Sequence, residues 1–264
     1  MKILVSNDDG IFHPGIWALV RAVKDLGEVF VVAPDRNQSG IGTAMTLHNP
    51  VRVKEVPATV PNVTAYAVEG TPADAVVIGL RELVPTDVDI VLSGINPGNN
   101  ITTNVLVSGT IGAAYAGHLN GICSMAISVG NNVDVDDKIV GLITRSAVNS
   151  LTDERPSINA LININFPSGD QFPVKDCEIT SPAPRVLQDY TRLSSEDSKP
   201  FYWIFRDRIP DIDLKSLPEN SDVLNLEKGY VTISSLSWCM EEETEKHVLQ
   251  NIKQNIQNTI QTEM

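Results

Sequence analysis

The sequence predicts an α/β fold: a Rossmann-like, mostly parallel sheet with helices on both faces, followed by a C-terminal β-hairpin arm and a terminal helix. Two observations carry this prediction. Short runs rich in Ile, Leu and Val alternate with segments of helical periodicity over the first two thirds of the 264 residues, as in parallel sheets covered by helices. Beyond about residue 180 the alternation stops, and residues 182–200 are polar and turn-rich. We therefore expect a core at residues 1–190 and a C-terminal part at 191–264 that is not an independent domain.

The chain begins with a strand and a helix. Residues 2–7 form a short, largely apolar run, which is typical of a strand buried on both faces. Apolar residues then recur at helical spacing over 15–26. Pro14 suits the first turn of that helix and Gly27 suits its end. The first unit of the core is thus predicted to be a strand followed by a covering helix.

The next predicted elements lie between residues 29 and 80. Residues 29–33 form a second core strand that a proline ends, and residues 45–56 and 63–68 are expected to be strands of less regular alternation. Thr71 is a good N-cap residue, and the proline after it is tolerated in a first turn, so a helix is predicted to begin there.

The alternation continues to the end of the core. The remaining predicted elements are a strand at 89–93, a helix of small residues at 108–120, a strand at 123–129, a helix at 137–151 and a strand at 158–166.

The C-terminal part has a different pattern. Phe201 to Phe205 is predicted to be an exposed hairpin arm, and residues 230–236 another strand. The tail from Glu241 is expected to be helical, with one apolar stripe at Val248, Leu249, Ile252, Ile256 and Ile260. Such a stripe has to be buried, either on the core of its own chain or on a second subunit.

Composition limits the class of function. The formal net charge of −13 repels nucleic-acid backbones, so no stable nucleic-acid binding is expected. Three widely spaced cysteines, Cys123, Cys177 and Cys239, predict no disulfide framework. No charged, apolar leader precedes the first strand, and no apolar run is long enough to span a bilayer. We therefore expect a cytoplasmic protein that does not bind membranes.

The adjacent carboxylates Asp8 and Asp9 are the most informative feature of the sequence. They directly follow the first predicted strand, and open α/β sheets bind ligands beyond the carboxyl ends of their strands. Two adjacent carboxylates repel each other, and a divalent cation offsets that repulsion. Ligands that are all oxygens favour a hard ion such as Mg²⁺ or Mn²⁺. The alternative interpretation is that Asp-Asp-Gly merely forms a turn.

Two later loops offer further oxygen donors. Ser39 lies in a polar, glycine-rich loop after the second strand, where Gly40 lets the backbone approach a ligand. Asn96 precedes a proline and should be held extended, which can direct its carbonyl at a cation. Alternatively, the first segment is a plain loop and the second is a turn whose Asn side chain bonds to nearby backbone.

A third loop leads into the helix of small residues. Ser108, Gly109 and Thr110 form a turn at a predicted helix N-terminus, where free N–H groups favour an anion. Ordinary capping and tight packing of small residues explain the same sequence equally well. The chain lacks the Walker lysine, the third Rossmann glycine and the hydrolase Gly-x-Ser-x-Gly elbow, so those three classes are disfavoured.

In this order, these motifs resemble the SurE family, the "survival protein E" nucleotidases. The matching stretches are residues 3–10 with Pro14-Gly15, then 32–40, 70–74, 93–99, 108–114 and 163–167, and residues 229–233 extend the match. Several specific motifs in one order are a stronger signal than any one of them.

The resemblance implies a Rossmann-like, metal-dependent phosphomonoesterase that hydrolyses nucleoside 5′-monophosphates, and 3′-monophosphates as well. It implies one divalent ion per subunit, Mg²⁺ or Mn²⁺, held by Asp8, Asp9, Ser39 and Asn96. It also implies a homodimer or tetramer that exchanges C-terminal elements, the terminal helix included, between subunits. With Asp8 and Asp9 as the catalytic residues, the expected phosphate-binding residues are Asn37, Gly40, Asn96, Ser108, Gly109 and Thr110.

Two positions depart from the family pattern. Val107 stands where the family usually has an aromatic residue, and His13 stands where it often has a small one. Both border the expected site and bear on substrate preference more than on the reaction.

Some alternatives stay open on the sequence alone. Asp8 is favoured as a metal ligand over a direct nucleophile on phosphorus, because a metal-bound carboxylate attacks poorly. No residue is singled out as the general acid. A nucleoside hydrolase or sugar transferase, and a nucleotide-binding regulator without catalysis, would use the same loops.

Overall fold

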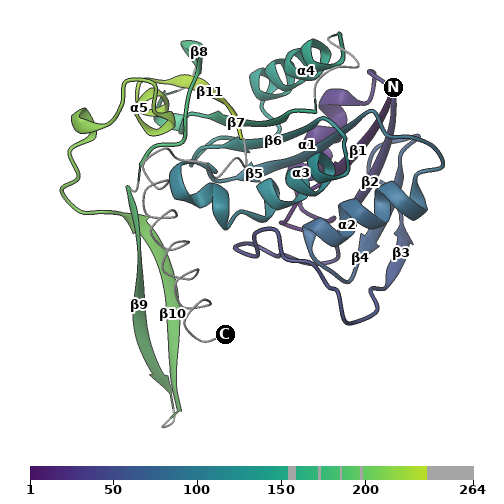
Figure 1. Ribbon diagram of the computed structural model, residues 1–264, viewed down its shortest axis with the longest axis horizontal. Coiled ribbons are helices and arrows are strands. Elements are labelled where there is room, and N and C mark those ends of the chain that lie inside the picture. Colours follow the sequence, from purple (N-terminus) through teal and green to yellow (C-terminus); the bar gives the residue numbers. More distant parts are fainter. Residues whose placement is uncertain (154–158, 172–173, 185, 197–198, 237–264) are drawn as a thin grey trace, which may run out of the picture.

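The structure is a computed structural model that describes residues 1–264 except 154–158, 172–173, 185, 197–198 and 237–264. Its centre is a nine-stranded sheet in the order β3-β4-β2-β1-β5-β6-β7-β11-β8 (Figure 1). These strands are β1 (Lys2–Ser6), β2 (Glu28–Pro34), β3 (Val53–Val56), β4 (Thr64–Val68), β5 (Ile90–Pro97), β6 (Ser124–Val129), β7 (Leu161–Phe166), β8 (Asp176–Ile179) and β11 (Tyr230–Ser235).

The sheet is mostly parallel, as predicted. Within it, β3 pairs antiparallel with β4 and β11 pairs antiparallel with β7, while the other neighbours run in parallel. The carboxyl ends of β1, β2 and β5 consequently meet at one edge of the sheet. The predicted oxygen donors lie at these ends, with Asp8, Asp9 and Ser39 in the loops after β1 and β2. Asn96 lies near the end of β5 itself rather than in the expected loop.

Helices cover both faces of the sheet (Figure 1). The pair α1 (Pro14–Val23) and α4 (Lys138–Asp153) packs on one face, and the pair α2 (Pro72–Ile78) and α3 (Gly109–Leu119) packs on the other. Alternate residues of β1 serve the two layers, because Ile3 and Val5 belong to the core beneath α1 while Leu4 belongs to the core beneath α2. No helix of the described residues is long and apolar enough to cross a membrane.

Local capping fixes where two of these helices begin. Thr71 accepts a hydrogen bond from the backbone N–H of Asp74, whose carboxylate accepts one from the N–H of Thr71, which completes a capping box. Ser108 caps α3 by accepting from the N–H of Ile111. The predicted N-cap at Thr71 is therefore confirmed.

The C-terminal part contains a long hairpin of β9 (Leu187–Glu196) and β10 (Lys199–Arg208), which projects from the core in Figure 1. The arm was predicted from Phe201 to Phe205. Its partner strand was not, because residues 182–200 were expected to be polar turns. Both faces of β9 are largely exposed, so no alternation of apolar and polar residues marks it as a strand.

Other boundaries shift by a few residues. Helix α1 ends at Val23 rather than at residue 26, and β5 extends to Pro97 rather than ending at residue 93. Of the strand expected at 45–56, only Val53–Val56 pairs with β4. A short helix, α5 (Asp222–Glu227), precedes β11. The predicted tail helix lies outside the described residues, and the division near residue 190 stays a prediction.

Candidate active site

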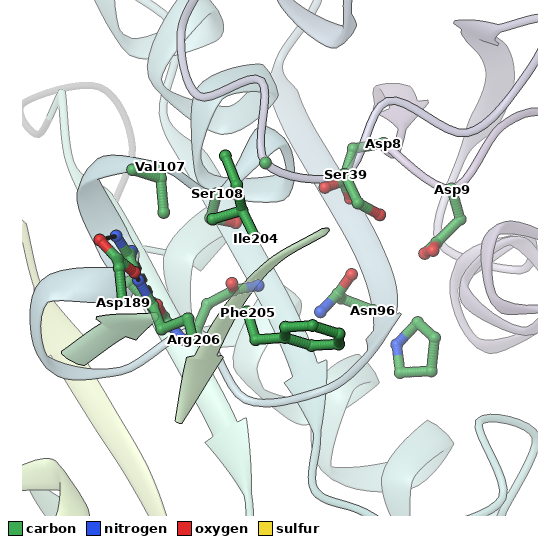
Figure 2. A pocket seen from close by; sticks show the side chains of 14 residues that line it. Asp8, Asp9, Ser39, Asn96, Val107, Ser108, Asp189, Ile204, Phe205 and Arg206 are labelled. Atoms are coloured by element: carbon green, nitrogen blue, oxygen red, sulfur yellow. Dashed lines mark hydrogen bonds and ion pairs between the residues drawn. The ribbon is translucent and has the colours of Figure 1, made fainter. Parts of the chain in front are cut away.

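A pocket of about 450 Å³ opens at the carboxyl ends of β1 and β5, beside the loop after β2. Figure 2 shows the labelled side chains that line it. Six residues predicted from the sequence are among them, and these are Asp8, Asp9, Ser39, Gly40, Asn96 and Ser108. Parallel strand ends that are far apart in sequence are thus brought to one cavity, as the α/β topology requires.

Asp8 is buried and bonded to the N-terminus of α3. Its Oδ1 accepts a hydrogen bond of 2.6 Å from the Thr110 hydroxyl. Burial raises the pKa of Asp8, and this effect outweighs the hydrogen bonds from the Thr110 hydroxyl and from backbone groups that favour the charged form. A Cβ on Gly109 would lie 2.6 Å from the Cβ of Asp8, so glycine is needed for this close approach.

Asp9 has few partners for a buried carboxylate. Burial, and then repulsion from Asp8, raise the pKa of Asp9 to about 7. Its Oδ1 accepts a long hydrogen bond of 3.5 Å from Asn37 Nδ2. Its Oδ2 is buried and has no hydrogen-bond donor among the described residues. A carboxylate that lines a pocket and has so few hydrogen-bond donors is suited to binding a cation.

His13 does not neutralise this carboxylate. The distance from His13 Nδ1 to Asp9 Oδ2 is 3.9 Å, but the same nitrogen accepts a hydrogen bond from the backbone N–H of Gly15. A ring nitrogen that accepts carries no proton. Burial also lowers the pKa of His13. The imidazole is therefore neutral and caps α1, and the two side chains do not form an ion pair.

Asn96 and Ser39 add neutral oxygens to the pocket. The Asn96 amide nitrogen donates to the backbone oxygen of Gly98 at 2.6 Å, which leaves the amide oxygen for other contacts. Figure 2 shows that oxygen turned to the side of the pocket where Asp8, Asp9 and Ser39 lie. Asn37 does not line the pocket; its Oδ1 accepts from the N–H of Ser39 at 2.9 Å and supports that loop.

The turn at the start of α3 has a structural role in this arrangement. The Ser108 hydroxyl caps the helix, and the Thr110 hydroxyl contacts Asp8. Gly109 and Thr110 are not among the residues that line the pocket, whereas Ser108 is. The donors of this helix N-terminus are therefore directed at the Asp8 carboxylate, beside the place expected for a phosphate.

Sequence reasoning missed the far wall of the pocket. Asn100 and Asn104 line it from the loop after β5, and the arm supplies Asp189, Ile204, Phe205 and Arg206. A buried asparagine network holds the loop, since the N–H and C=O of Asn100 bond to Asn165 and Asn163 side chains on β7. The repeated Asn in an otherwise apolar strand was the available signal for this network.

The donor set fits a hard divalent cation. It consists of two carboxylates, one hydroxyl and one amide oxygen, and oxygen ligands of this kind are those that Mg²⁺ and Mn²⁺ prefer. Across the described ranges, no group of three or more His, Cys, Asp or Glu side chains gathers in a way that could hold a metal. The set at this pocket has two carboxylates, Asp8 and Asp9, and its other donors are neutral oxygens.

Fold and pocket together define a class: a Rossmann-like α/β protein with an acidic, oxygen-lined pocket at the carboxyl edge of its sheet. The family model described as "Survival protein SurE" matches residues 3–189. The chain belongs to the SurE family.

Individual relatives agree with this assignment over most of the chain. A protein named 5′-nucleotidase SurE from Dehalococcoides mccartyi (strain CBDB1) is 40% identical over 238 residues, which are 89% of this chain and 88% of the relative. A protein of the same name from Pelotomaculum thermopropionicum is 34% identical over 253 residues, covering 96% and 94%. The crystal structure of the SurE protein from Aquifex aeolicus matches with a TM-score of 0.77 and 29% identity, covering 96% of this chain and 100% of that one.

Proposed function

We propose that this chain is a metal-dependent 5′-nucleotidase, which hydrolyses nucleoside 5′-monophosphates to nucleoside and inorganic phosphate. Activity on 3′-monophosphates and on other phosphomonoesters belongs to the same proposal. The observation that carries it is the Asp8–Asp9 pair, which lines a pocket with neutral oxygens although burial raises both pKa values. Membership of a family whose curated relatives are named 5′-nucleotidase supports it.

In this proposal Asp8, Asp9, Ser39 and Asn96 hold one Mg²⁺ or Mn²⁺. When bound, such an ion neutralises phosphate charge and lowers the pKa of a coordinated water. The Oδ2 of Asp9 supports this assignment, since it is buried and accepts no hydrogen bond from the described residues.

Gly40 and Ser108, which also line the core end of the pocket, are proposed to bind and orient the phosphate. Gly40 has a left-handed backbone (φ 79°) and no neighbour within 4 Å of an added Cβ, so a ligand can approach its backbone closely. Ser108 borders the same space, while Asn37, Gly109 and Thr110 hold Ser39 and Asp8 in place. The last three therefore act on phosphate binding through their neighbours.

Release of phosphate from AMP tests the proposal. We expect the wild type to release phosphate with Mn²⁺ or Mg²⁺ and to stop when a chelator is added. Asp8→Asn and Asp9→Asn keep the shape of the side chains and should lower kcat/KM by about a hundredfold or more. Near-normal turnover of either variant in excess Mn²⁺ contradicts the metal assignment. Release of free base instead of phosphate identifies a nucleoside hydrolase, and ligand-induced stabilisation without any product identifies a regulator.

The proposal extends to assembly and location. We propose a homodimer, or a tetramer built from such dimers, in the cytoplasm. Leu193, Phe201 and Trp203 on the arm are exposed apolar side chains, and exposed apolar patches of this kind mark interaction surfaces.

A further inference from the structure

The pocket has two chemically different ends. In Figure 2 Asp8 and Asp9 lie at one end and Asp189 and Arg206 at the other, with Phe205 between them. The first end is built from the loops of the core. The second is built from the arm, whose strand β10 reaches the pocket with three successive residues. The proposed function uses the first end alone, and the second end has no role in it.

The arm end presents an apolar surface to the pocket. Ile204 is 76% exposed, Phe205 38% and Val107 36%, although all three line the cavity. The Phe205 ring stacks on Tyr190 of β9, with ring centroids 5.3 Å apart and planes 18° apart. The ring is therefore held by its partner strand. Exposed apolar side chains that line a pocket offer a surface on which the apolar part of a ligand can be buried.

Arg206 fastens this surface to the core. Its Nε and Nη2 donate to the two carboxylate oxygens of Asp189 at 2.6 and 2.9 Å, and its Nη1 donates to Asn104 Oδ1 at 3.1 Å. Asn104 belongs to the 3-10 helix Thr102–Leu106, which leads directly to the cap of α3. Asp189 lies on β9 of the arm itself, so the bond to Asn104 is the one that links arm and core. The bidentate pair with Asp189 neutralises the guanidinium, so Arg206 is not a free cation for phosphate.

We propose that Phe205, Ile204 and Val107 form the subsite on which the nucleobase of the substrate packs, with Arg206 as the positioning residue that holds the arm over the pocket. This inference rests on the proposed function and adds the part of the enzyme that recognises the base. A flat aromatic base stacks on an aromatic or aliphatic wall with little dependence on its identity. The departure at Val107 lies in this subsite, so it concerns base recognition.

Comparing AMP with ribose 5-phosphate tests the subsite, because the two phosphomonoesters differ by the base. We expect Phe205→Ala to raise KM for AMP about tenfold with little change in kcat, as loss of one stacking contact predicts. KM for ribose 5-phosphate should stay within about twofold of the wild-type value. Phe205→Leu, which keeps apolar volume without a flat ring, should give an intermediate KM for AMP.

The matched control is Tyr202→Ala, which removes an exposed aromatic side chain from the same strand outside the pocket. It should leave KM for both substrates unchanged. Arg206→Gln should also raise KM for AMP but not for ribose 5-phosphate, because it removes the bond that holds the arm to Asn104. Arg206→Lys should not restore the wild-type KM, because lysine cannot bond to Asp189 through two nitrogens and to Asn104 at the same time.

The outcomes separate the two proposals. Wild-type enzyme that hydrolyses both substrates, with Phe205→Ala raising KM equally for both or for neither, overturns the base subsite and leaves the nucleotidase intact. Wild-type enzyme that releases phosphate from neither substrate overturns the proposed function itself.

Discussion

The fold destabilises the charged form of Asp9 relative to the protonated form. Its pKa rises to about 7 from an ordinary value of 3.8, first because of burial and then because of Asp8. The folded state therefore binds this proton more tightly than the unfolded chain does. In the metal-free protein, the contribution of Asp9 to the free energy of unfolding should then fall as pH rises between about 4 and about 7.

Asp9→Asn removes this dependence. We expect the wild type to lose stability relative to Asp9→Asn across that pH window, as measured by urea denaturation in a chelator. Asp176→Asn, which replaces an exposed carboxylate on β8, is the control and should follow the wild-type curve. A difference between wild type and Asp9→Asn that stays constant with pH contradicts the proposed burial of charge.

Gly109 tests the contact between α3 and Asp8. An added Cβ would lie 2.6 Å from the Asp8 Cβ and 2.9 Å from its Oδ2. Gly109→Ala should cost about 1–3 kcal/mol of stability through overpacking, and it should displace Asp8 and lower kcat. Gly141→Ala on α4 is the matched control: its nearest neighbour is the Ala22 Cβ at 3.8 Å, so stability should rise by about 0.5–1 kcal/mol. Equal effects of the two changes would refute the close packing.

At the scale of elements, α5 links the loop after β5 to the C-terminal part through hydrogen bonds. Asp222 at its start accepts from the backbone N–H of Thr102 at 2.8 Å, of Ala183 at 2.9 Å and of Val223 at 2.7 Å. Burial raises the pKa of this carboxylate despite these donors. One side chain thus joins three segments that are remote in sequence, and one of them leads to the pocket.

Removing that carboxylate leaves buried N–H groups unpaired. Asp222→Ala should lower the free energy of unfolding by about 3 kcal/mol, measured by chemical denaturation. Asp213→Ala deletes a similar cap on the exposed 3-10 helix Leu214–Ser216 and should cost about 1 kcal/mol or less. A smaller loss for Asp222→Ala than for Asp213→Ala would contradict the role assigned to it.

Local patterns were sufficient for most elements of the core. Strand β2 was predicted to within two residues because its continuous apolar run indicates burial on both faces. Helix α3 was predicted to the same precision because its small residues and its Ser cap stand next to each other in the sequence. Strand β9 was missed because its stability comes from pairing with β10 rather than from burial. A strand of that kind carries no period-2 signal in its own sequence.

At the scale of the whole molecule, the core side of the pocket could be predicted from the topology, and the arm side could not. Asp8, Ser39 and Asn96 each follow a predicted core strand, and the carboxyl ends of parallel strands share one edge. That they converge on one ion was implied by the resemblance to the SurE family. The contact of Arg206 with Asn104 joins positions 102 residues apart and depends on how the arm leaves the core. Neither residue type nor spacing could have predicted it.

The arm also predicts assembly. Its exposed side chains Leu193, Phe201 and Trp203 should be covered in an oligomer. We expect light scattering to give a dimer or tetramer mass for the full chain, and Phe201→Ser combined with Trp203→Ser to shift it toward the monomer mass. A wild type that remains monomeric at high concentration contradicts this proposal.

The central claim is that four oxygen donors, on two loops and at the end of β5, hold one divalent ion, and calorimetric titration with Mn²⁺ tests it most directly. We predict one Mn²⁺ site per chain, with an affinity at least about tenfold weaker in Asp9→Asn and in Asn96→Ala and unchanged in Asp176→Asn. No Mn²⁺ binding by the wild type, or equal affinity in all four proteins, would contradict it.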